Sequence, residues 1–327
     1  MKTIELKAED ILATMISGEV VQTEHNKELW ESEDERLNQI IEEYDKKIRK
    51  YYKNQEKLIP HHICIKENMP IVNKRQYRMN IEKQIEVKRQ CEEMLLKGII
   101  EESNSPWNSP IILVPKKDNK WRICVDFRLL NNITKEESCP PPTTQECFDV
   151  LGVSNYFSTL DLEAGYHQIP MDEQSKHMTA FTTVTGKYHY KKMPFGLRNA
   201  PSHFQNIMYV VLQKFIPNKC IAYMDDIIVF SKGKEEHYNI LKEILNQLAE
   251  YGLKINLDKC QFIKKEIEFL GFKIMEKKLF PAESKNEKLQ NILKSKNKKE
   301  LRSALGFLSY YRQFIRNFAS KTKQLNK

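Results

Sequence analysis

Two adjacent carboxylates in an apolar setting are the side chains of this sequence best suited to chemistry. Asp225 and Asp226 stand between the runs 221–224 and 227–230, which consist of β-prone apolar residues. Such flanks predict a hairpin buried on both faces, with the two aspartates at or beside its turn. At a separation of about 5 Å and an effective dielectric near 20, the two charges repel by roughly 3 kcal/mol. The pattern therefore indicates a compensating cation, with an ordinary Asp-rich turn as the alternative.

A third aspartate has a similar setting. Asp161 ends the β-prone run 156–160, and an aspartate at a strand end can face the same cleft as a neighbouring hairpin. Carboxylate oxygens without accompanying His or Cys ligands favour Mg²⁺ or Mn²⁺ over zinc. Two such ions, held about 3.5–4 Å apart, activate the attacking oxygen and stabilise the leaving oxygen in phosphoryl transfer. The residues alone leave open the choice between a two-metal site and structural turns.

These carboxylates need strands and helices to hold them. Apolar periodicity and helix start and stop signals predict the helices, and β-prone runs between turn residues predict the strands. The expected helices are 33–52, 81–97, 143–151, 200–215 and 235–251, and the expected strands and hairpins are 111–114 with 121–125, 156–160, 178–192, 220–230 and 268–274. Strands and helices are interspersed without a strict βαβ repeat, so the expected fold class is α+β.

The excess positive charge is concentrated at one end of the chain. The formal net charge is +9, and residues 283–327 contain 12 Lys or Arg against 3 Asp or Glu, which accounts for all of it. The pattern of this segment is helical, and its charge would attract polyanions such as nucleic acid or an anionic membrane surface. A solvated lysine-rich tail would carry the same charge, so the charge alone does not decide between these roles.

Composition narrows the class of protein. The seven cysteines are scattered and include no Cys-x-x-Cys pair, which argues against a disulfide framework or a zinc knuckle and favours a reducing compartment. The N-terminal residues lack the apolar core of a signal peptide, and no run approaches the roughly 18 apolar residues of a membrane helix. We therefore expect a soluble, intracellular protein, cytoplasmic or nuclear, with no membrane partner.

Five ordered motifs give the sequence a recognisable resemblance. They are Trp-Arg-Ile-Cys-Val-Asp-Phe-Arg-Leu-Leu-Asn at 121–131, Phe-Ser-Thr-Leu-Asp-Leu at 157–162 with Gly-Tyr-His-Gln-Ile at 165–169, Met-Pro-Phe-Gly-Leu-Arg-Asn-Ala-Pro at 193–201, Tyr-Met-Asp-Asp at 223–226 and Phe-Leu-Gly-Phe at 269–272. Together they resemble the reverse transcriptases of gypsy-type LTR retrotransposons and retroviral Pol polyproteins. The resemblance extends from about His61 to Leu325.

This resemblance implies a right-hand polymerase with fingers, a ferredoxin-like palm and a thumb, preceded by a helical extension. The implied boundaries are 1–58 for the extension, 59–135 and 169–199 for the fingers, 136–168 and 200–277 for the palm, and 278–327 for the thumb. The implied partners are an RNA or DNA template with its primer, and dNTP substrates. The sequence shows no protease, RNase H or integrase motif, and we expect RNase H and integrase to come from a longer polyprotein or from other proteins.

The resemblance also assigns roles to individual residues. Asp161, Asp225 and Asp226 would be catalytic and, with the carbonyl of Leu162, would bind two Mg²⁺ or Mn²⁺ ions. The dNTP would be held by Lys117 (or Lys116), Arg122, Tyr166 as a sugar gate and Phe195; the primer grip would be Leu270 and Gly271; and Arg302, Arg312 and Arg316 would bind nucleic acid. For Lys117 and Arg122 the non-functional alternative is a solvated turn. For Tyr166 it is a core aromatic, and for the Leu-Gly pair it is packing in a strand.

Two rival functions stay open at this point. A catalytically silent nucleic-acid-binding remnant would keep the fold, but unused like charges at 161, 225 and 226 would cost stability. An RNA-dependent RNA polymerase would usually carry Gly-Asp-Asp and would lack an aromatic sugar gate, so Tyr223 and Tyr166 argue against it. The preferred prediction is an active RNA-directed DNA polymerase.

Overall fold

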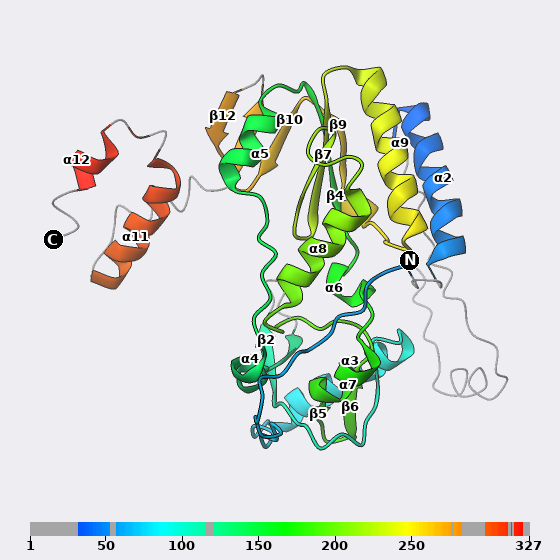
Figure 1. The fold of residues 1–327 in the computed structure, drawn as a ribbon, viewed down its shortest axis with the longest axis vertical. Coiled ribbons are helices and arrows are strands. Elements are labelled where there is room, and N and C mark those ends of the chain that lie inside the picture. The colour runs from blue at the N-terminus through cyan, green and yellow to red at the C-terminus, as the bar shows by residue number, and fades with distance from the viewer. Residues whose placement is uncertain are drawn as a thin grey trace, which may run out of the picture.

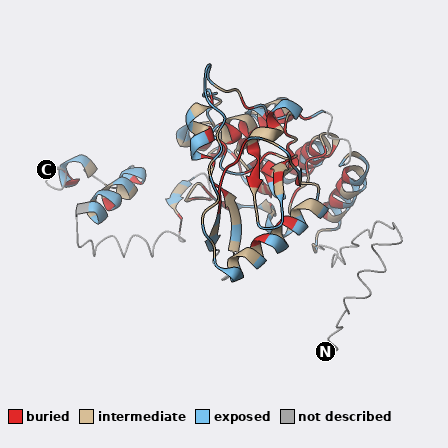
Figure 2. Cartoon of the chain, turned by 90° about the horizontal axis from the view of Figure 1, so that it is seen from below, coloured by how far each residue is buried: buried red, intermediate tan, exposed pale blue. Residues whose placement is uncertain are grey.

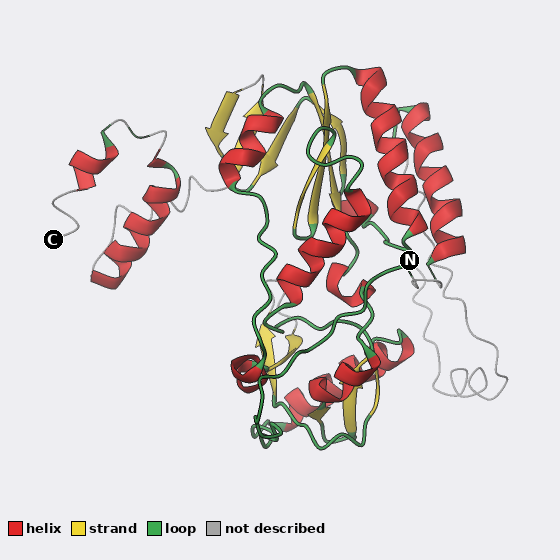
Figure 3. Ribbon diagram, in the orientation of Figure 1, coloured by secondary structure: helices red, strands yellow, loops and turns green. Residues whose placement is uncertain are grey.

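The computed structural model describes residues 32–52, 57–115, 121–275, 278–282, 298–312, 315 and 317–322. Helices and strands are mixed without a regular repeat, as the sequence predicts (Figures 1 and 3). The helices are α2 (Glu35–Tyr51), α3 (Ile81–Leu96), α4 (Arg128–Ile133), α5 (Thr144–Leu151), α6 (Gly165–Gln168), α7 (Glu173–Lys176), α8 (Ala200–Leu212), α9 (Lys234–Glu250), α11 (Lys298–Tyr310) and α12 (Phe318–Thr322). The strands are β1 (Ile100–Glu102), β2 (Ile111–Pro115), β3 (Trp121–Val125), β4 (Tyr156–Asp161), β5 (Phe181–Thr182), β6 (Lys187–Tyr190), β7 (Cys220–Tyr223), β8 (Asp226–Ser231), β9 (Gln261–Lys264), β10 (Glu266–Phe269), β11 (Phe272–Met275) and β12 (Lys278–Pro281).

A four-stranded antiparallel sheet, in the order β7-β8-β4-β9, forms the centre of the larger group of elements. Phe157, Ile228 and Phe230 belong to a core shared with α5 and with β10 and β11. Ile227 and Val229, which alternate with them along β8, belong to the core shared with α2, α8 and α9. The strands of this sheet therefore have buried residues on both faces, which confirms the prediction for the hairpin 220–230. Figure 2 shows buried residues gathered in the interior of the main body of the molecule.

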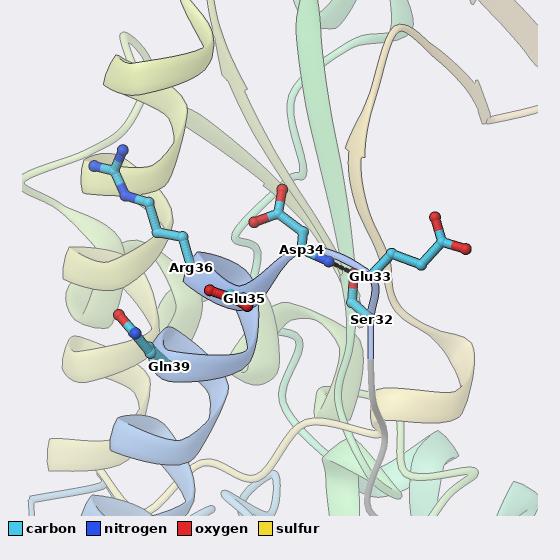
Figure 4. Close-up of a pocket in the computed structure, with 6 residues that line it drawn as sticks. All are labelled: Ser32, Glu33, Asp34, Glu35, Arg36 and Gln39. Atoms are coloured by element: carbon cyan, nitrogen blue, oxygen red, sulfur yellow. Dashed lines mark hydrogen bonds between the residues drawn. The ribbon is translucent and has the colours of Figure 1, made fainter.

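Helix α2 lies along α9 (Figure 1). Its buried residues recur at helical spacing and form one apolar stripe: Leu37, Ile40, Ile41, Tyr44 and Ile48. Asp34 caps it, since its carboxylate accepts a hydrogen bond from the backbone N–H of Leu37 at 3.2 Å. The backbone N–H of Asp34 in turn donates to Ser32 Oγ at 3.1 Å (Figure 4). Packing of the apolar stripe, more than the cap, fixes α2 on the protein.

A second group of strands and helices, which includes α3, lies at the other end of the view in Figure 1. It contains the hairpin β2–β3 and the sheet β1-β6-β5. The hairpin pairs Ile111 with Val125 and Pro115 with Trp121, as its sequence predicts. The residues that join the two strands, 116–120, lie outside the described part, and so does Lys117.

One predicted strand is wrong. The sequence favours a single strand over 268–274, whereas the chain forms two antiparallel strands, β10 and β11, that pair Phe269 with Phe272. Leu270 and Gly271 make the turn between them with φ angles of 49° and 80°. Two consecutive residues with positive φ are what a tight two-residue hairpin requires, and glycine adopts that conformation readily. Leucine does not signal it, which is why the sequence misleads here.

A buried histidine ties α9 to the central sheet. His237 is fully buried, and its Nε2 and Nδ1 lie 2.8 Å from Ser158 Oγ on β4 and 3.0 Å from Ser231 Oγ on β8. Burial lowers the pKa of His237 to about 4. His61 is also buried, and its pKa is lowered to about 3, again mainly by burial. Both imidazoles are therefore neutral at pH 7 in the folded protein.

Lowering the pH from 7.5 to 5 is expected to reduce the free energy of unfolding. A histidine with a lowered folded-state pKa contributes stability above its unfolded value of 6.5, and this contribution is lost as the pH falls towards the folded value. At pH 5 the loss from His237 is about 2 kcal/mol, and His61 adds a similar amount. Urea unfolding at the two pH values measures the effect. His237→Gln should show a shallower pH dependence than the wild type; equal slopes would contradict the assignment.

None of the helices in the described ranges is long and apolar enough to cross a membrane. Helices α11 and α12 agree with the helical pattern predicted beyond residue 283. Residues 283–297 lie outside the described part.

Candidate active site

The three predicted carboxylates lie at one end of the central sheet. Asp161 is the last residue of β4 and is the register partner of Asp226, the first residue of β8. Asp225 sits in the two-residue turn between β7 and β8, after Met224, whose φ is 53°. The hairpin register and the length of β4 thus bring together residues more than 60 positions apart in the sequence.

A buried glutamine that the sequence did not single out fixes this turn. Gln205 on α8 donates from Nε2 to the carbonyl of Ala222 at 2.9 Å, and its Oε1 accepts from the backbone N–H of Met224 at 2.8 Å. Its side chain is buried, so both bonds lie in a place where unpaired amide groups would be costly. Gln205 therefore determines where the turn presents Asp225. A polar residue on the apolar face of a predicted helix was the only sequence signal for it.

The electrostatics of the three carboxylates favour a cation. Burial, and after it the charges of Asp226 and Asp161, raises the pKa of Asp225. Burial and the charge of Asp161 raise the pKa of Asp226. Within the described part of the chain, the buried Oδ1 of Asp225 has no hydrogen-bond partner. Lys259 Nζ lies 3.4 Å from Asp161 Oδ1 but is largely exposed, so it offsets the repulsion only partly.

The chemical type of these side chains fits a hard divalent cation. The donors are carboxylate oxygens, and the orphaned Asp225 Oδ1 is the atom that an ion would satisfy. Gly165 keeps the space beside it open, since a Cβ there would lie 3.3 Å from Asp225 Oδ1 and 3.1 Å from the ring of Phe204. In the ranges that the structure describes, no three His, Cys, Asp or Glu side chains are gathered into a ready ligand cluster.

An aromatic stack stands next to the carboxylates. The ring centroids of Tyr166 and Phe195 lie 4.9 Å apart, with an interplanar angle of 19°. The ring of Phe204 also contacts Tyr166, with a centroid distance of 5.2 Å. Tyr166 is buried, whereas 47% of Phe195 is exposed. Burial and the charge of Asp225 raise the pKa of Tyr166 to about 12. Tyr166 is therefore a rigid, neutral wall close to the carboxylates, and Phe195 offers an open apolar surface in front of it.

Arg122, the second predicted dNTP-binding cation, lies on β3. It is exposed, opposite Val114 in the β2–β3 register. Burial, and after it the charges of Lys97 and Arg122, lowers the pKa of His167, the residue that follows Tyr166, to about 4. Lys117, which the resemblance also assigns to dNTP binding, lies outside the described residues.

The predicted primer-grip turn is fastened by two tyrosines. Tyr310, the last residue of α11, and Tyr311, which follows it, donate from their hydroxyls to the carbonyls of Leu270 at 2.7 Å and Gly271 at 3.0 Å. Phe269, which precedes the turn, packs edge-on against Tyr223 at 6.1 Å. The turn thus lies beside the β7–β8 hairpin and is connected to α11.

The basic residues predicted to bind nucleic acid are only partly placed. Arg302 on α11 and Arg312 just after it are exposed, and Arg316 lies outside the described residues. Exposure leaves their guanidinium groups free for phosphate, but also fits a solvated surface.

Comparisons of the sequence identify relatives. The family profile "Reverse transcriptase (RNA-dependent DNA polymerase)" matches residues 114–274. The "Retrovirus-related Pol polyprotein from transposon 297" of Drosophila melanogaster is 43% identical over 284 residues, 84% of this chain and 27% of that protein. The polyprotein from transposon gypsy of the same organism is 36% identical over 241 residues, 72% of this chain and 23% of that protein. The chain therefore spans about a quarter of the length of these relatives.

Solved structures share the fold. The foamy viral protease-reverse transcriptase in complex with an RNA/DNA hybrid matches with a TM-score of 0.75 and 26% identity, over 100% of this chain and 43% of that chain. Its complex with double-stranded DNA matches with a TM-score of 0.78 and the same identity, over 100% of this chain and 57% of that chain. The α+β architecture is thus a right-hand polymerase fold, as predicted. With this fold, this profile match and these relatives, the chain belongs to the reverse transcriptase family of retrotransposon Pol polyproteins.

Proposed function

We propose that the chain is an RNA-directed DNA polymerase that adds dNTPs to a primer 3′-hydroxyl and also accepts a DNA template. The observation that carries this proposal is the meeting of three carboxylates beside an aromatic stack, in a chain of the reverse transcriptase family. The orphaned Oδ1 of Asp225 supports it, because a buried carboxylate oxygen without a donor is suited to a metal ion.

Asp161, Asp225, Asp226 and the carbonyl of Leu162 would hold two Mg²⁺ or Mn²⁺ ions. When bound, these ions supply activation of the primer hydroxyl and neutralisation of charge on the transferred phosphate. The chain itself contributes alignment: the β4 end and the β7–β8 turn hold the carboxylates, and Gln205 holds the turn. Asp226, at the more exposed position, is the weaker ligand in this proposal.

The incoming nucleotide would lie between β3 and the aromatic stack. Arg122 suits a triphosphate because its guanidinium binds phosphate oxygens with two parallel hydrogen bonds, and Lys117 would add a mobile charge. Tyr166 would lie under the deoxyribose and exclude a 2′-hydroxyl. Phe195 would border the base and sugar.

The proposed partners are a primed RNA or DNA template. The two foamy viral neighbours are complexes with an RNA/DNA hybrid and with double-stranded DNA, and the exposed Arg302 and Arg312 suit phosphates. Arg316 and the turn of Leu270 and Gly271 complete the proposed duplex contacts. The boundaries of fingers, palm and thumb given above, and an intracellular location, belong to the same proposal. RNase H and integrase would come from a longer polyprotein or from other proteins.

Nucleotide and template choice test the proposed function. Purified protein should extend a primer on RNA and on DNA templates with dNTPs and Mg²⁺ or Mn²⁺, and EDTA should stop the reaction. Extension with rNTPs at a similar rate would instead indicate an RNA polymerase. Duplex binding without any extension would indicate a catalytically silent remnant.

Removal of the Tyr311 hydroxyl is expected to shorten the DNA products made in one binding event. Tyr311→Phe deletes the hydrogen bond to Gly271 and loosens the link between α11 and the proposed primer grip. One such bond contributes about 1 kcal/mol, so we expect roughly fivefold faster dissociation from the primer-template with an unchanged KM for dNTP. A heparin-trap extension assay measures this. A higher KM for dNTP with normal product length would place the effect elsewhere.

A further inference from the structure

Helix α2 lies outside the segment that matches the family profile, yet it is closely joined to the fold. Its apolar stripe packs on α9, and polar contacts along the helix fasten it to the same neighbour. Arg36 forms an ion pair with Glu235 and lies 4.5 Å above the ring of Tyr238, and Lys242 Nζ lies 2.8 Å from Glu43 Oε2. Figure 4 shows the start of this helix, with Arg36 directed towards α9.

Tyr44 carries a contact from α2 to a different part of the chain. Its ring is buried, with 2% of the residue exposed. Its hydroxyl donates to the carbonyl of Leu253 at 3.0 Å and accepts from the backbone N–H of Ile255 at 2.9 Å. One side-chain hydroxyl thus satisfies two backbone groups of the segment 253–256, as a neighbouring strand would.

The opposite edge of segment 253–256 holds the backbone of the proposed metal site. The N–H of Asn256 donates to the carbonyl of Asp161 at 2.8 Å, and the N–H of Glu163 donates to the carbonyl of Lys254 at 2.9 Å. These two bonds form a bridge around Leu162 and Ile255. The two bonds use the carbonyl of Asp161 and the N–H of Glu163, which flank Leu162, so the carbonyl of Leu162 takes no part in the bridge.

Gln168 strengthens the same edge. Its Nε2 donates to the carbonyl of Lys254 at 2.8 Å, and its Oε1 accepts from the N–H of Lys254 at 2.7 Å. Successive backbone groups of an extended segment point to opposite sides. Segment 253–256 is therefore held between Tyr44 on one side and residues 161–168 on the other.

We propose that Tyr44 is a positioning residue of the active site, and that α2 is an integral part of the polymerase. The Tyr44 hydroxyl fixes segment 253–256, and this segment fixes the backbone of Asp161 and Leu162. Without that hydroxyl, the carbonyl of Leu253 and the N–H of Ile255 lose their hydrogen bonds to it, and the segment can shift. The inference rests on the proposed function for its effect on DNA synthesis, but its effect on ion binding and backbone mobility does not need that function.

A matched pair of variants tests this role. Tyr44→Phe removes the hydroxyl that contacts segment 253–256. Tyr238→Phe removes a hydroxyl from the same α2–α9 interface, where it binds the Asp34 side chain, and leaves segment 253–256 alone. Both variants keep the ring. For each, hydrogen exchange of peptides that cover 253–260 is measured on metal-free protein, Mn²⁺ binding is measured by electron paramagnetic resonance, and primer extension is measured against Mg²⁺ concentration.

The expected result is specific to Tyr44. Exchange in 253–260 should accelerate about tenfold in Tyr44→Phe, and Mn²⁺ affinity should fall about fivefold, with a matching rise in the Mg²⁺ needed for half-maximal extension. Tyr238→Phe should change neither by more than about twofold. Equal behaviour of the two variants, or wild-type exchange and affinity in Tyr44→Phe, would overturn the proposal.

Two further outcomes are distinguishable. If the wild type does not extend a primer, the proposed function fails, while exchange and Mn²⁺ binding still decide the role of Tyr44. If Tyr44→Phe does not fold, the milder Ile40→Val loosens α2 without touching the hydroxyl. In Ile40→Val, the hydrogen-exchange rate in 253–260 should then increase by a larger factor than the rate in α9. A larger increase in α9 would contradict the proposal.

Discussion

Exchange of Asp225 for Asn is expected to stabilise the metal-free protein while it abolishes DNA synthesis. The substitution removes a half-buried charge that is repelled by Asp226 and Asp161 and whose Oδ1 has no hydrogen-bond partner among the described residues. Loss of this charge relieves its desolvation and its repulsion by the two neighbouring carboxylates, worth about 1–3 kcal/mol, so we expect the melting temperature to rise by roughly 2–4 °C. Loss of a ligand worth several kcal/mol should lower the rate of extension by about a thousandfold or more.

The pH dependence of this gain gives a second readout. Because the pKa of Asp225 is raised above 3.8 in the folded state, its cost is present at neutral pH and disappears as the pH falls below 3.8. Differential scanning calorimetry at pH 7 and near pH 4 should show the advantage of Asp225→Asn shrinking. Added Mg²⁺ should stabilise the wild type more than the variant. Asp258→Asn, at an exposed position near Lys259, is the control and should leave both quantities unchanged; a destabilised Asp225→Asn would contradict the account.

Shortening Tyr166 is expected to relax the choice between dNTP and rNTP. The ring is buried and packs against both Phe195 and Phe204, so it is not free to move aside for a 2′-hydroxyl. Tyr166→Val should raise kcat/KM for rNTP relative to dNTP by roughly a hundredfold, which is what steric exclusion of one small group provides. Single-nucleotide incorporation with dTTP and rUTP on an RNA template measures the ratio.

The matched control for this prediction is Tyr166→Phe. It keeps the ring and removes only the hydroxyl, so it should discriminate as the wild type does. If Tyr166→Val also discriminates normally, the ring is a core aromatic without a gating role, and the proposed position of the deoxyribose is wrong.

The parts of the fold predicted correctly are those determined by local pattern. The hairpin 220–230 could be predicted because apolar flanks of a two-aspartate turn require burial on both faces, and α2 could be predicted from its apolar stripe. The register that pairs Asp161 with Asp226 was not in the sequence pattern, but both residues lie at strand ends, and that is why they could be expected to meet.

What could not be predicted depends on contacts between distant residues. The turn at Leu270 and Gly271 is held by tyrosine hydroxyls about 40 residues further along the chain, and a leucine gives no local sign of positive φ. The hydrogen bonds of Gln205 and Tyr44 join side chains to backbone groups of other elements. Periodicity reports which face of a helix is buried, but not which polar atom lies on it or what it binds.

The most direct test of the central claim is extension of an oligo(dT) primer on poly(rA) with dTTP and Mg²⁺ or Mn²⁺. Wild type and Asp225→Asn are compared, with binding of the same duplex measured in parallel. The proposed site predicts extension by the wild type, none by Asp225→Asn, and similar duplex binding by both. Extension by Asp225→Asn at the wild-type rate, or duplex binding without extension by either protein, would contradict the claim that these carboxylates carry RNA-directed DNA synthesis.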